Sequence, residues 1–184
     1  GTNVREDRWG ADLEGRTRFA CEVVRAIRAA VGADYPIVLR WSQWKQQDFS
    51  ARLADTPEAL EAFLAPLAAA GVDCFHCSTR RYWEPEFEGS ELNLAGWTKK
   101  LTGLPTITVG SIGLDTDFIS TYGSDETAGT RGIDDLVRRL EADEFDLVAV
   151  GRALVANPDW ANRVRAGSFE DLATYERAML AELV

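Results

Sequence analysis

Two stretches of the sequence end in residues that could bind an anion. Each is a β-branched run that stops at a glycine: TITVGS ends at Gly110-Ser111, and DLVAVGR ends at Gly151-Arg152. A strand that ends at glycine and leads into a helix presents backbone N–H groups, and no Cβ keeps an anion away from them. The guanidinium of Arg152 would add a forked, permanently charged partner for phosphate. Two such ends on neighbouring parallel strands would form one phosphate site; the alternative is two ordinary tight turns and a solvated arginine.

A third candidate is Arg40, which lies near the end of the apolar run YPIVLRW at residues 35–41. The run has the length of a buried strand, and burying a guanidinium is costly unless it meets an anion or another hydrogen-bonding partner. We therefore expect Arg40 either to contact a bound ligand or to form a structural salt bridge with one of the many acidic residues.

Composition and charge restrict the class of protein. The chain has 184 residues, of which 46% are hydrophobic, so residues 1–184 are expected to form a single domain with a sizeable core. It carries 20 basic and 30 acidic residues, a formal net charge of −10. Nucleic acid is therefore not expected as a partner, because neutralising phosphates supplies most of that affinity. No apolar run approaches the ~20 residues of a membrane span and no signal-peptide pattern opens the chain, so we expect no membrane partner and a cytoplasmic location.

The cysteines and the histidine give little support for a metal centre. Cys74 and Cys77 form a C-x-x-C pair, but both lie in a predicted strand, where residues three apart point to opposite faces. His76 is the only histidine in the chain, so a catalytic Ser-His-Asp triad has equally thin support. We expect no metal site and interpret His76 as a structural residue.

Apolar runs of strand length alternate with amphipathic helical patterns along the chain. Strands are predicted at residues 35–41, 72–78, 104–110 and 145–151, and helices at residues 12–31, 57–70, 94–101, 133–142, from 158 onward and 169–183. In the first helix Phe19, Val23 and Ile27 form one apolar stripe. Two long loops, residues 79–93 and 112–132, separate these elements and are of a length that usually has a function.

This alternation predicts an α/β fold with a parallel sheet covered by helices. Each polar or glycine residue noted above falls at the carboxyl end of a strand, where ligands bind in open α/β sheets and in TIM barrels. No G-x-G-x-x-G follows the first strand, which argues against a Rossmann dinucleotide domain. Four strand–helix units correspond to half of a (β/α)8 barrel.

The same segments resemble the Old Yellow Enzyme family of flavin oxidoreductases. NVREDRWGADLEGRTRF is similar to the family pattern N-x-R-x-D-x-[YW]-G-G-x-x-x-x-R-x-R-F, with Ala11 where the second glycine is common. IVLRW, FHCSTRRYWEPEFEGS, TITVGSIG and FDLVAVGRALVANPDWANRVR follow in the family's order, and the last two are the most specific. The family is a TIM barrel that holds FMN, and the resemblance covers essentially the whole chain as the C-terminal half of that barrel.

The resemblance implies a role for each matching position. Arg40 would lie against the pyrimidine edge of FMN, where its charge stabilises the reduced ring. The phosphate of FMN would be held around the two strand ends, by Val109, Gly110, Ser111, Val150, Gly151 and Arg152. Tyr82, Trp83 and Phe87 would flank the substrate pocket, unless these aromatic side chains only anchor their loop. Such enzymes take hydride from NAD(P)H onto the flavin and pass it to an activated alkene such as an enone.

In this family the other half of the barrel supplies the residues that grip the substrate and the usual proton donor, so no catalytic residue is expected in these 184 residues. A half-barrel leaves two sheet edges unpaired, and we expect it to be unstable as a monomer. The expected partner is a complementary N-terminal half-barrel chain or segment; self-association into a pseudo-barrel is another alternative. The competing functional hypotheses are a non-catalytic phosphate-binding or scaffolding half-barrel and a different phosphate-binding barrel enzyme.

Overall fold

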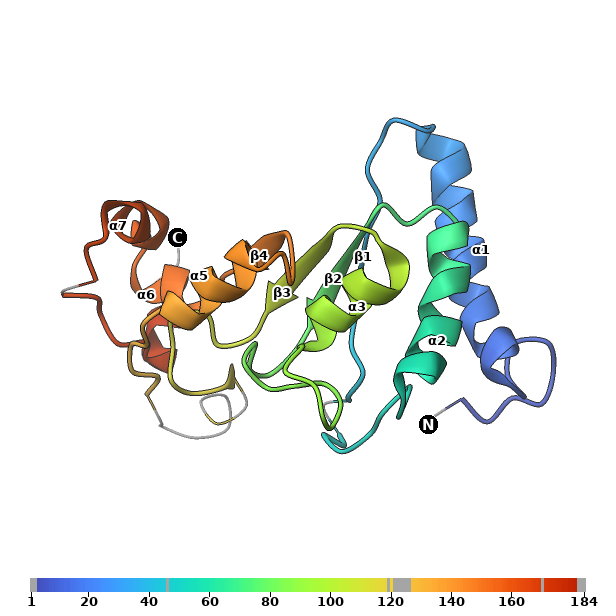
Figure 1. Cartoon of the computed structure of the whole chain (residues 1–184), viewed down its shortest axis with the longest axis horizontal. Helices are drawn as coiled ribbons and strands as arrows, with labels where there is room; N and C mark the ends of the chain where they lie inside the picture. Colours follow the sequence, from blue (N-terminus) through green and yellow to red (C-terminus); the bar gives the residue numbers. More distant parts are fainter. Residues whose placement is uncertain (1–2, 46, 119, 121–126, 170, 182–184) are drawn as a thin grey trace.

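The computed structural model describes residues 3–45, 47–118, 120, 127–169 and 171–181. Its four strands are all parallel and lie side by side in the order of the sequence, β1-β2-β3-β4 (Figure 1). Their bounds are Val38–Trp41 for β1, Cys74–Ser78 for β2, Thr106–Val109 for β3 and Leu147–Ala149 for β4. The predicted parallel α/β arrangement is therefore confirmed, although each strand is shorter than the apolar run that predicted it.

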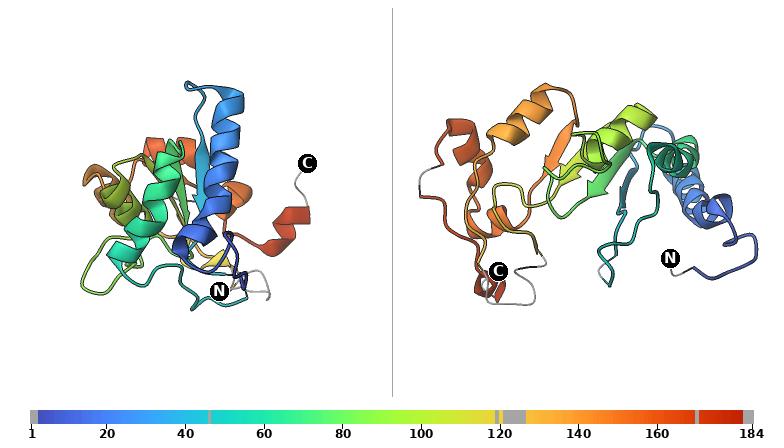
Figure 2. Two further views of the ribbon diagram at one scale, coloured as in Figure 1. Left: turned by 90° about the vertical axis from the view of Figure 1, so that its right-hand side faces the viewer. Right: turned by 60° about the horizontal axis from the view of Figure 1, so that its bottom comes forward.

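The helices cover one face of a curved sheet and leave the other face open (Figure 2). Helix α1 precedes β1, and α2, α3 and α5 connect successive strands. The bounds are Leu13–Val31 (α1), Pro57–Ala69 (α2), Leu94–Thr102 (α3), Asp134–Glu141 (α5), Arg152–Ala156 (α6), Trp160–Ala166 (α7) and Arg177–Ala181 for the 3-10 helix η1. Within the described ranges, no helix combines the length and the apolar character that crossing a membrane would need.

Local signals in the sequence explain where these helices begin. The side chain of Asp12 accepts a hydrogen bond from the Gly15 N–H at 2.7 Å, and that of Thr56 accepts one from Ala59 at 3.2 Å. Pro57 occupies the first turn of α2, where its missing N–H costs nothing. Capping of this kind satisfies backbone donors that have no partner within the helix. The predicted N-caps at Asp12 and Thr56 are confirmed.

The alternation of side chains along the strands gives the sheet two unlike faces. Phe75, Cys77, Thr106 and Thr108 point toward the helices and are completely buried. The opposite side chains form what we call the open face, which consists of Val38, Arg40, Cys74, His76, Ser78, Ile107, Val109, Leu147 and Ala149. On this face Val38 is 51% exposed and Leu147 is 55% exposed. Nothing in the described chain covers this face at the edge strands β1 and β4.

The apolar stripe predicted on the first helix is not part of the core. Phe19 is 67% exposed, and Val23 and Ile27 are each 42% exposed. Helix α1 instead buries Cys21 and Val24 and packs against α2. Since α1 lies at one end of the sheet, it has a neighbouring helix on one flank only, and its second apolar flank faces outward (Figure 1).

The long C-terminal helix predicted at residues 169–183 is also wrong for the described residues, where only η1 is helical. Tyr175 forms an antiparallel bridge with Ala128, with two backbone hydrogen bonds of 3.1 Å, and its side chain is buried. The Asn157 side chain binds the backbone of Ala173 through both its oxygen and its nitrogen. These contacts fix an extended segment where the sequence pattern predicted a helix; residues 170 and 182–184 lie outside the described residues.

Asn93 is a fully buried polar residue that fixes the loop after β2. Its amide nitrogen donates to the carbonyl of Tyr82 at 2.8 Å and to the hydroxyl of Thr108 at 3.1 Å. Its oxygen caps α3 by accepting from the Gly96 N–H at 2.9 Å. The N–H of Tyr82 in turn donates to the carbonyl of Gly110. Asn93 therefore links the loop to the end of β3.

We expect Asn93→Ala to lower the free energy of unfolding by about 2–4 kcal/mol, because it removes a helix cap and leaves buried backbone groups without partners. Urea denaturation measures this loss. Asn162→Ala is the matched control, since Asn162 is an exposed residue of α7, and it should cost less than about 0.5 kcal/mol. Equal losses in the two variants would contradict the role given to Asn93.

Candidate functional site

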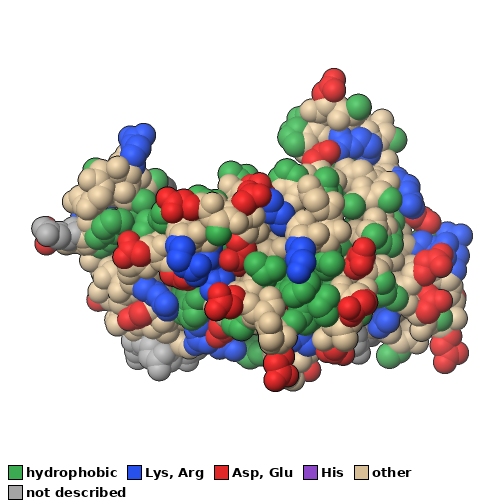
Figure 3. Space-filling model, viewed as in Figure 1, with side chains coloured by type: hydrophobic (Ala, Val, Ile, Leu, Met, Phe, Trp, Pro, Cys, Tyr) green, Lys and Arg blue, Asp and Glu red, His purple; other side chains and the backbone are tan. Residues whose placement is uncertain are grey.

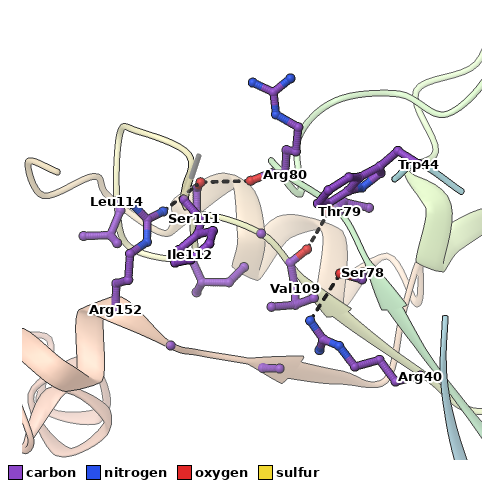
Figure 4. A pocket seen from close by; sticks show the side chains of 14 residues that line it. Arg40, Trp44, Ser78, Thr79, Arg80, Val109, Ser111, Ile112, Leu114 and Arg152 are labelled. Carbon is purple, nitrogen blue, oxygen red and sulfur yellow. Dashed lines mark hydrogen bonds between the residues drawn. The ribbon is translucent and has the colours of Figure 1, made fainter. Parts of the chain in front are cut away.

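A cavity of about 310 Å³ opens where the four strands end (Figure 4). We call it the strand-end cavity. Each strand contributes residues from its carboxyl end or from the loop after it, and the lining consists of Arg40, Trp44, Ser78, Thr79, Arg80, Val109, Gly110, Ser111, Ile112, Leu114, Phe118, Ala149, Gly151 and Arg152. Parallel pairing places all four carboxyl ends at one edge of the sheet, so segments far apart in the sequence meet there.

The structure brings most of the residues predicted to bind the cofactor together around this cavity. Those that line it are Arg40, Val109, Gly110, Ser111, Gly151 and Arg152. Val150 is the exception: its side chain lies on the helix side of β4, in an apolar groove beside α5 and α7. Any contact that Val150 makes with a ligand in the strand-end cavity would therefore come from its backbone.

The strand-end cavity is cationic within an acidic protein. Arg40, Arg80 and Arg152 line it, and no carboxylate is among its described lining residues. The chain as a whole has a net charge of −10, and acidic and basic side chains are interspersed over the face seen in Figure 3. A concave site lined by one sign of charge concentrates ligands of the opposite sign. This cavity is suited to an anion.

Arg152 is held beside the end of β3. Its Nη2 donates to the carbonyl of Thr116 at 2.6 Å and lies 3.4 Å from the hydroxyl of Ser111. The Ser111 hydroxyl is itself within hydrogen-bonding distance of the carbonyls of Arg80 and Thr116. Burial lowers the pKa of Arg152 from its usual value, but a guanidinium stays protonated in a protein. Arg152 and Ser111 therefore form one linked polar wall of the cavity.

The two glycines at the strand ends have different surroundings. Gly110 has φ of +137°, and a Cβ there would lie 2.7 Å from the Thr79 hydroxyl oxygen and 2.8 Å from the Thr79 carbonyl oxygen. Glycine is needed at this position because the loop after β2 approaches its backbone closely. Apart from its chain neighbours, a Cβ on Gly151 would meet no atom of the described residues within 4 Å. Since Gly151 lines the cavity, its backbone borders open space that a ligand group can occupy.

Arg40 lies on the open face and does not form the salt bridge that was one of its two expected roles. None of the ion pairs between described residues includes Arg40. Its guanidinium contacts the imidazole of His76. It also donates to the hydroxyl of Ser78 at 3.2 Å (Figure 4). Arg40 thus keeps its positive charge without a neighbouring carboxylate in the described chain.

The three aromatic residues predicted to flank a substrate do not line the strand-end cavity. Tyr82 is 1% exposed and meets Trp83 edge-on, with ring centroids 5.1 Å apart. Phe87 meets Trp97 of α3 in the same manner at 5.3 Å. The guanidinium of Arg131 lies over the Trp83 ring. These contacts support the alternative in which the aromatic side chains anchor their loop.

Sequence reasoning missed Arg80 and Trp44 as cavity residues. Arg80 stands two residues after the end of β2, just as Ser111 stands two residues after the end of β3. The expectation that ligands bind just beyond the carboxyl ends of the strands would therefore have found it. Its Nη2 donates to Asp117 at 2.9 Å, and Asp117 is completely buried and also accepts from Arg81 at 2.6 Å. Trp44 comes from the loop after β1, and its sequence carries no signal that distinguishes it from the other tryptophans.

The two cysteines beside His76 lie on opposite faces of β2, as predicted, and neither forms a disulfide. Burial raises the pKa of the Cys77 thiol to about 12. A thiol with such a pKa is unreactive near neutral pH. Among the residues that the structure describes, no three His, Cys, Asp or Glu side chains come together in a group that could hold a metal ion.

The fold and the cavity define a parallel α/β protein with an arginine-lined cavity at its strand ends. Comparison with known proteins identifies the family. Residues 1–171 match the NADH:flavin oxidoreductase / NADH oxidase family, and the chain belongs to that family. The family predicted from the sequence motifs is confirmed, and with it FMN and a reduced nicotinamide as the cofactors of such enzymes.

Individual relatives agree with this assignment. The chain is 34% identical to an NADH oxidase of Thermoanaerobacter brockii, over 90% of the chain and 23% of the relative. It is 28% identical to a bilirubin reductase of Clostridium symbiosum, over 92% of the chain and 43% of the relative. The chain thus spans less than half of the length of these curated relatives.

Solved structures show the same fold. The Old Yellow Enzyme homologue of Zymomonas mobilis superposes with a TM-score of 0.67 at 16% identity, over 97% of this chain and 44% of that one. Morphinone reductase in complex with tetrahydroNAD superposes with a TM-score of 0.65 at 22% identity, over 97% of this chain and 41% of that one. The chain therefore has the fold of part of these proteins.

The contrast between the two glycines gives a stability test. Gly110→Ala should lower the free energy of unfolding by at least about 1–3 kcal/mol. Alanine is strained at the positive φ of this position, and the new Cβ would press on Thr79. Gly151→Ala should cost less than about 0.5 kcal/mol, because the added methyl group meets no other residue in the described part of the chain. Chemical denaturation of both variants measures the difference. A Gly151 variant as unstable as the Gly110 variant would show that the space beside Gly151 is not open.

Proposed function

We propose that the protein containing this chain is an FMN-dependent NAD(P)H oxidoreductase that reduces activated alkenes, such as enones, by hydride transfer. In this proposal the chain supplies part of the FMN site. The observation that carries it is the strand-end cavity, where three arginines and no described carboxylate surround a space at the carboxyl ends of parallel strands. The family membership supports FMN as the anion that this site binds.

The residues around the cavity fit the phosphate end of FMN. Arg152 offers a fixed positive charge, Ser111 a hydroxyl, and Gly151 a backbone with free space in front of it. Phosphate prefers forked guanidinium donors and backbone N–H groups that no Cβ shields. Gly110 permits the close turn that brings Ser111 to this position. We assign the phosphate contacts to these four residues, with Val109 and the backbone of Val150 beside them.

Arg40 fits the other end of the cofactor. It lies across the cavity from the phosphate residues, and its guanidinium has no carboxylate partner among the described residues. Bound FMN would supply the hydride chemistry, and the protein's part is orientation and electrostatics. The charge of Arg40 would stabilise negative charge on the reduced ring, while apolar lining residues such as Ile112 and Leu114 would exclude water.

In this proposal the substrate lies beside the loops that follow the strands. Tyr82, Trp83 and Phe87 would act here indirectly, by holding residues 79–93 in place through the ring contacts described above. The non-catalytic alternative, a scaffolding or phosphate-binding half-barrel, is not favoured, because the curated relatives that match the chain carry the names of oxidases and reductases.

Arg152→Gln should weaken FMN binding about 10- to 100-fold, since it removes charge-assisted hydrogen bonds worth about 1.5–3 kcal/mol. Quenching of flavin fluorescence on binding measures the dissociation constant. Arg165→Gln is the matched control, because Arg165 is an exposed arginine of α7 outside the cavity, and it should leave the dissociation constant unchanged. FMN binding that responds equally to both substitutions would contradict a specific phosphate contact.

We also propose that the 184 residues form one structural unit that requires further strands to close a (β/α)8 barrel. The exposed open face, the two free sheet edges at β1 and β4, and the exposed stripe of α1 all support this. A complementary segment with four strand–helix units would pair with both edges, since relatives are more than twice as long as this chain. Exposed sheet edges of this kind otherwise pair with other chains.

The chain alone should therefore associate in solution, and static light scattering over a range of concentrations measures its mass. Val38→Lys, which places a charge on the edge strand β1, should reduce this association. A single discrete dimer would point to closure by two copies of the chain instead of a complementary segment. A monomer that unfolds cooperatively would contradict the requirement for further strands.

A further inference from the structure

We propose that His76 is a positioning residue that holds the guanidinium of Arg40 at the mouth of the strand-end cavity. The contact between His76 and Arg40 does not depend on FMN. Its effect on the reduced flavin rests on the proposed function. It assigns a role to the only histidine among the 184 residues.

The register of the sheet places the two side chains together. Arg40 of β1 pairs with His76 of β2, so both side chains stand on the open face at the same level. The Nη1 of Arg40 lies 2.5 Å from Nε2 of His76 and 3.2 Å from Nδ1. Its Nη2 donates to Ser78, the next residue of β2 on that face, at 3.2 Å. Two successive side chains of β2 thus hold both ends of one guanidinium.

The chemistry of the pair fixes the state of the imidazole. A guanidinium has donors only, so a ring nitrogen that bonds to it must be an acceptor without a proton. The Nη1 of Arg40 lies close to both ring nitrogens, so the contact favours the neutral imidazole in either tautomer. Burial, and after it the charge of Arg40, lower the pKa of His76, which agrees with this state.

The neighbours of His76 on the open face do not compete for this contact. They are Arg40 on β1, Ile107 on β3, and Cys74 and Ser78 on its own strand. Arg40 is the only charged side chain among these described neighbours, and burial raises the pKa of the Cys74 thiol, which keeps it neutral.

These contacts fix the position of the positive charge of Arg40. Arg40 is exposed on a strand at the edge of the sheet, and a long side chain in that position would otherwise sample many rotamers. The acceptors on His76 and Ser78 restrict it to one position beside the cavity. If FMN binds as proposed, this contact decides how strongly Arg40 stabilises the reduced ring.

The first experiment uses the FMN-loaded protein and compares His76→Phe with His76→Gln. Phenylalanine keeps a ring but has no acceptor, whereas the side-chain oxygen of glutamine can still accept from Arg40. His76→Phe should weaken FMN binding roughly 3- to 10-fold, the effect of losing one typical hydrogen bond, and make the midpoint potential of FMN more negative. His76→Gln should keep the FMN dissociation constant within about twofold of the wild-type value. Its midpoint potential should stay close to that of the wild type. Ser78→Ala should have the same effect as His76→Phe, but smaller.

A purely structural role for His76 predicts a different result. Both variants would then lower stability and leave the midpoint potential unchanged, and this outcome would overturn the inference while the proposed function stands. If the wild-type protein fails to bind FMN, the proposed function fails, and the second experiment decides the inference alone.

The second experiment follows the imidazole of His76 by nitrogen NMR, assigned by its loss in His76→Phe. The expected spectrum is that of the neutral ring, with a pKa below the usual value for histidine. Arg40→Gln should raise that pKa, because it removes the neighbouring positive charge. A pKa that does not respond to Arg40→Gln would show that the two side chains do not interact.

Discussion

The parallel pairing of four strands in sequence order is the constraint on which the site depends. In this register Arg40 lies opposite His76, and Ser78 lies opposite Val109, which in turn faces Ala149. Parallel strands end at one edge, so every loop that follows a strand opens onto the same space. Pairing shifted by one residue would turn these side chains to the helix-covered face. The position of the cavity, and the side chains that face it, follow from this register.

The second determinant is the distribution of charge. The chain carries ten more acidic than basic residues, yet the strand-end cavity is lined by three arginines. Each arginine is held by different partners: Arg40 by neutral side chains, Arg152 by a backbone carbonyl, and Arg80 by the buried carboxylate of Asp117. Neutral partners orient a guanidinium without cancelling its charge, which leaves Arg40 able to attract an anion.

Features that depend on local sequence could be predicted, and features that depend on distant contacts could not. The strands, the helix caps at Asp12 and Thr56 and the glycine ends of β3 and β4 were read correctly, because each follows from a few adjacent residues. The exposure of Phe19 could not be predicted, since the amphipathic pattern of α1 shows two apolar flanks but not which one has a neighbour. The C-terminal helix failed because the bridge between Ala128 and Tyr175 joins segments distant in sequence. The packing of Tyr82 depends in the same way on the buried amide of Asn93.

The most direct test of the central claim compares the affinities of FMN and riboflavin, which differ only in the phosphate group. If the strand-end cavity binds that phosphate, the protein should bind FMN at least about 100-fold more tightly than riboflavin, because several charge-assisted hydrogen bonds are lost with the phosphate. Raising the salt concentration should reduce the difference. Equal affinities for the two flavins would contradict the account, since the arginines at the strand ends would then contribute nothing to cofactor binding.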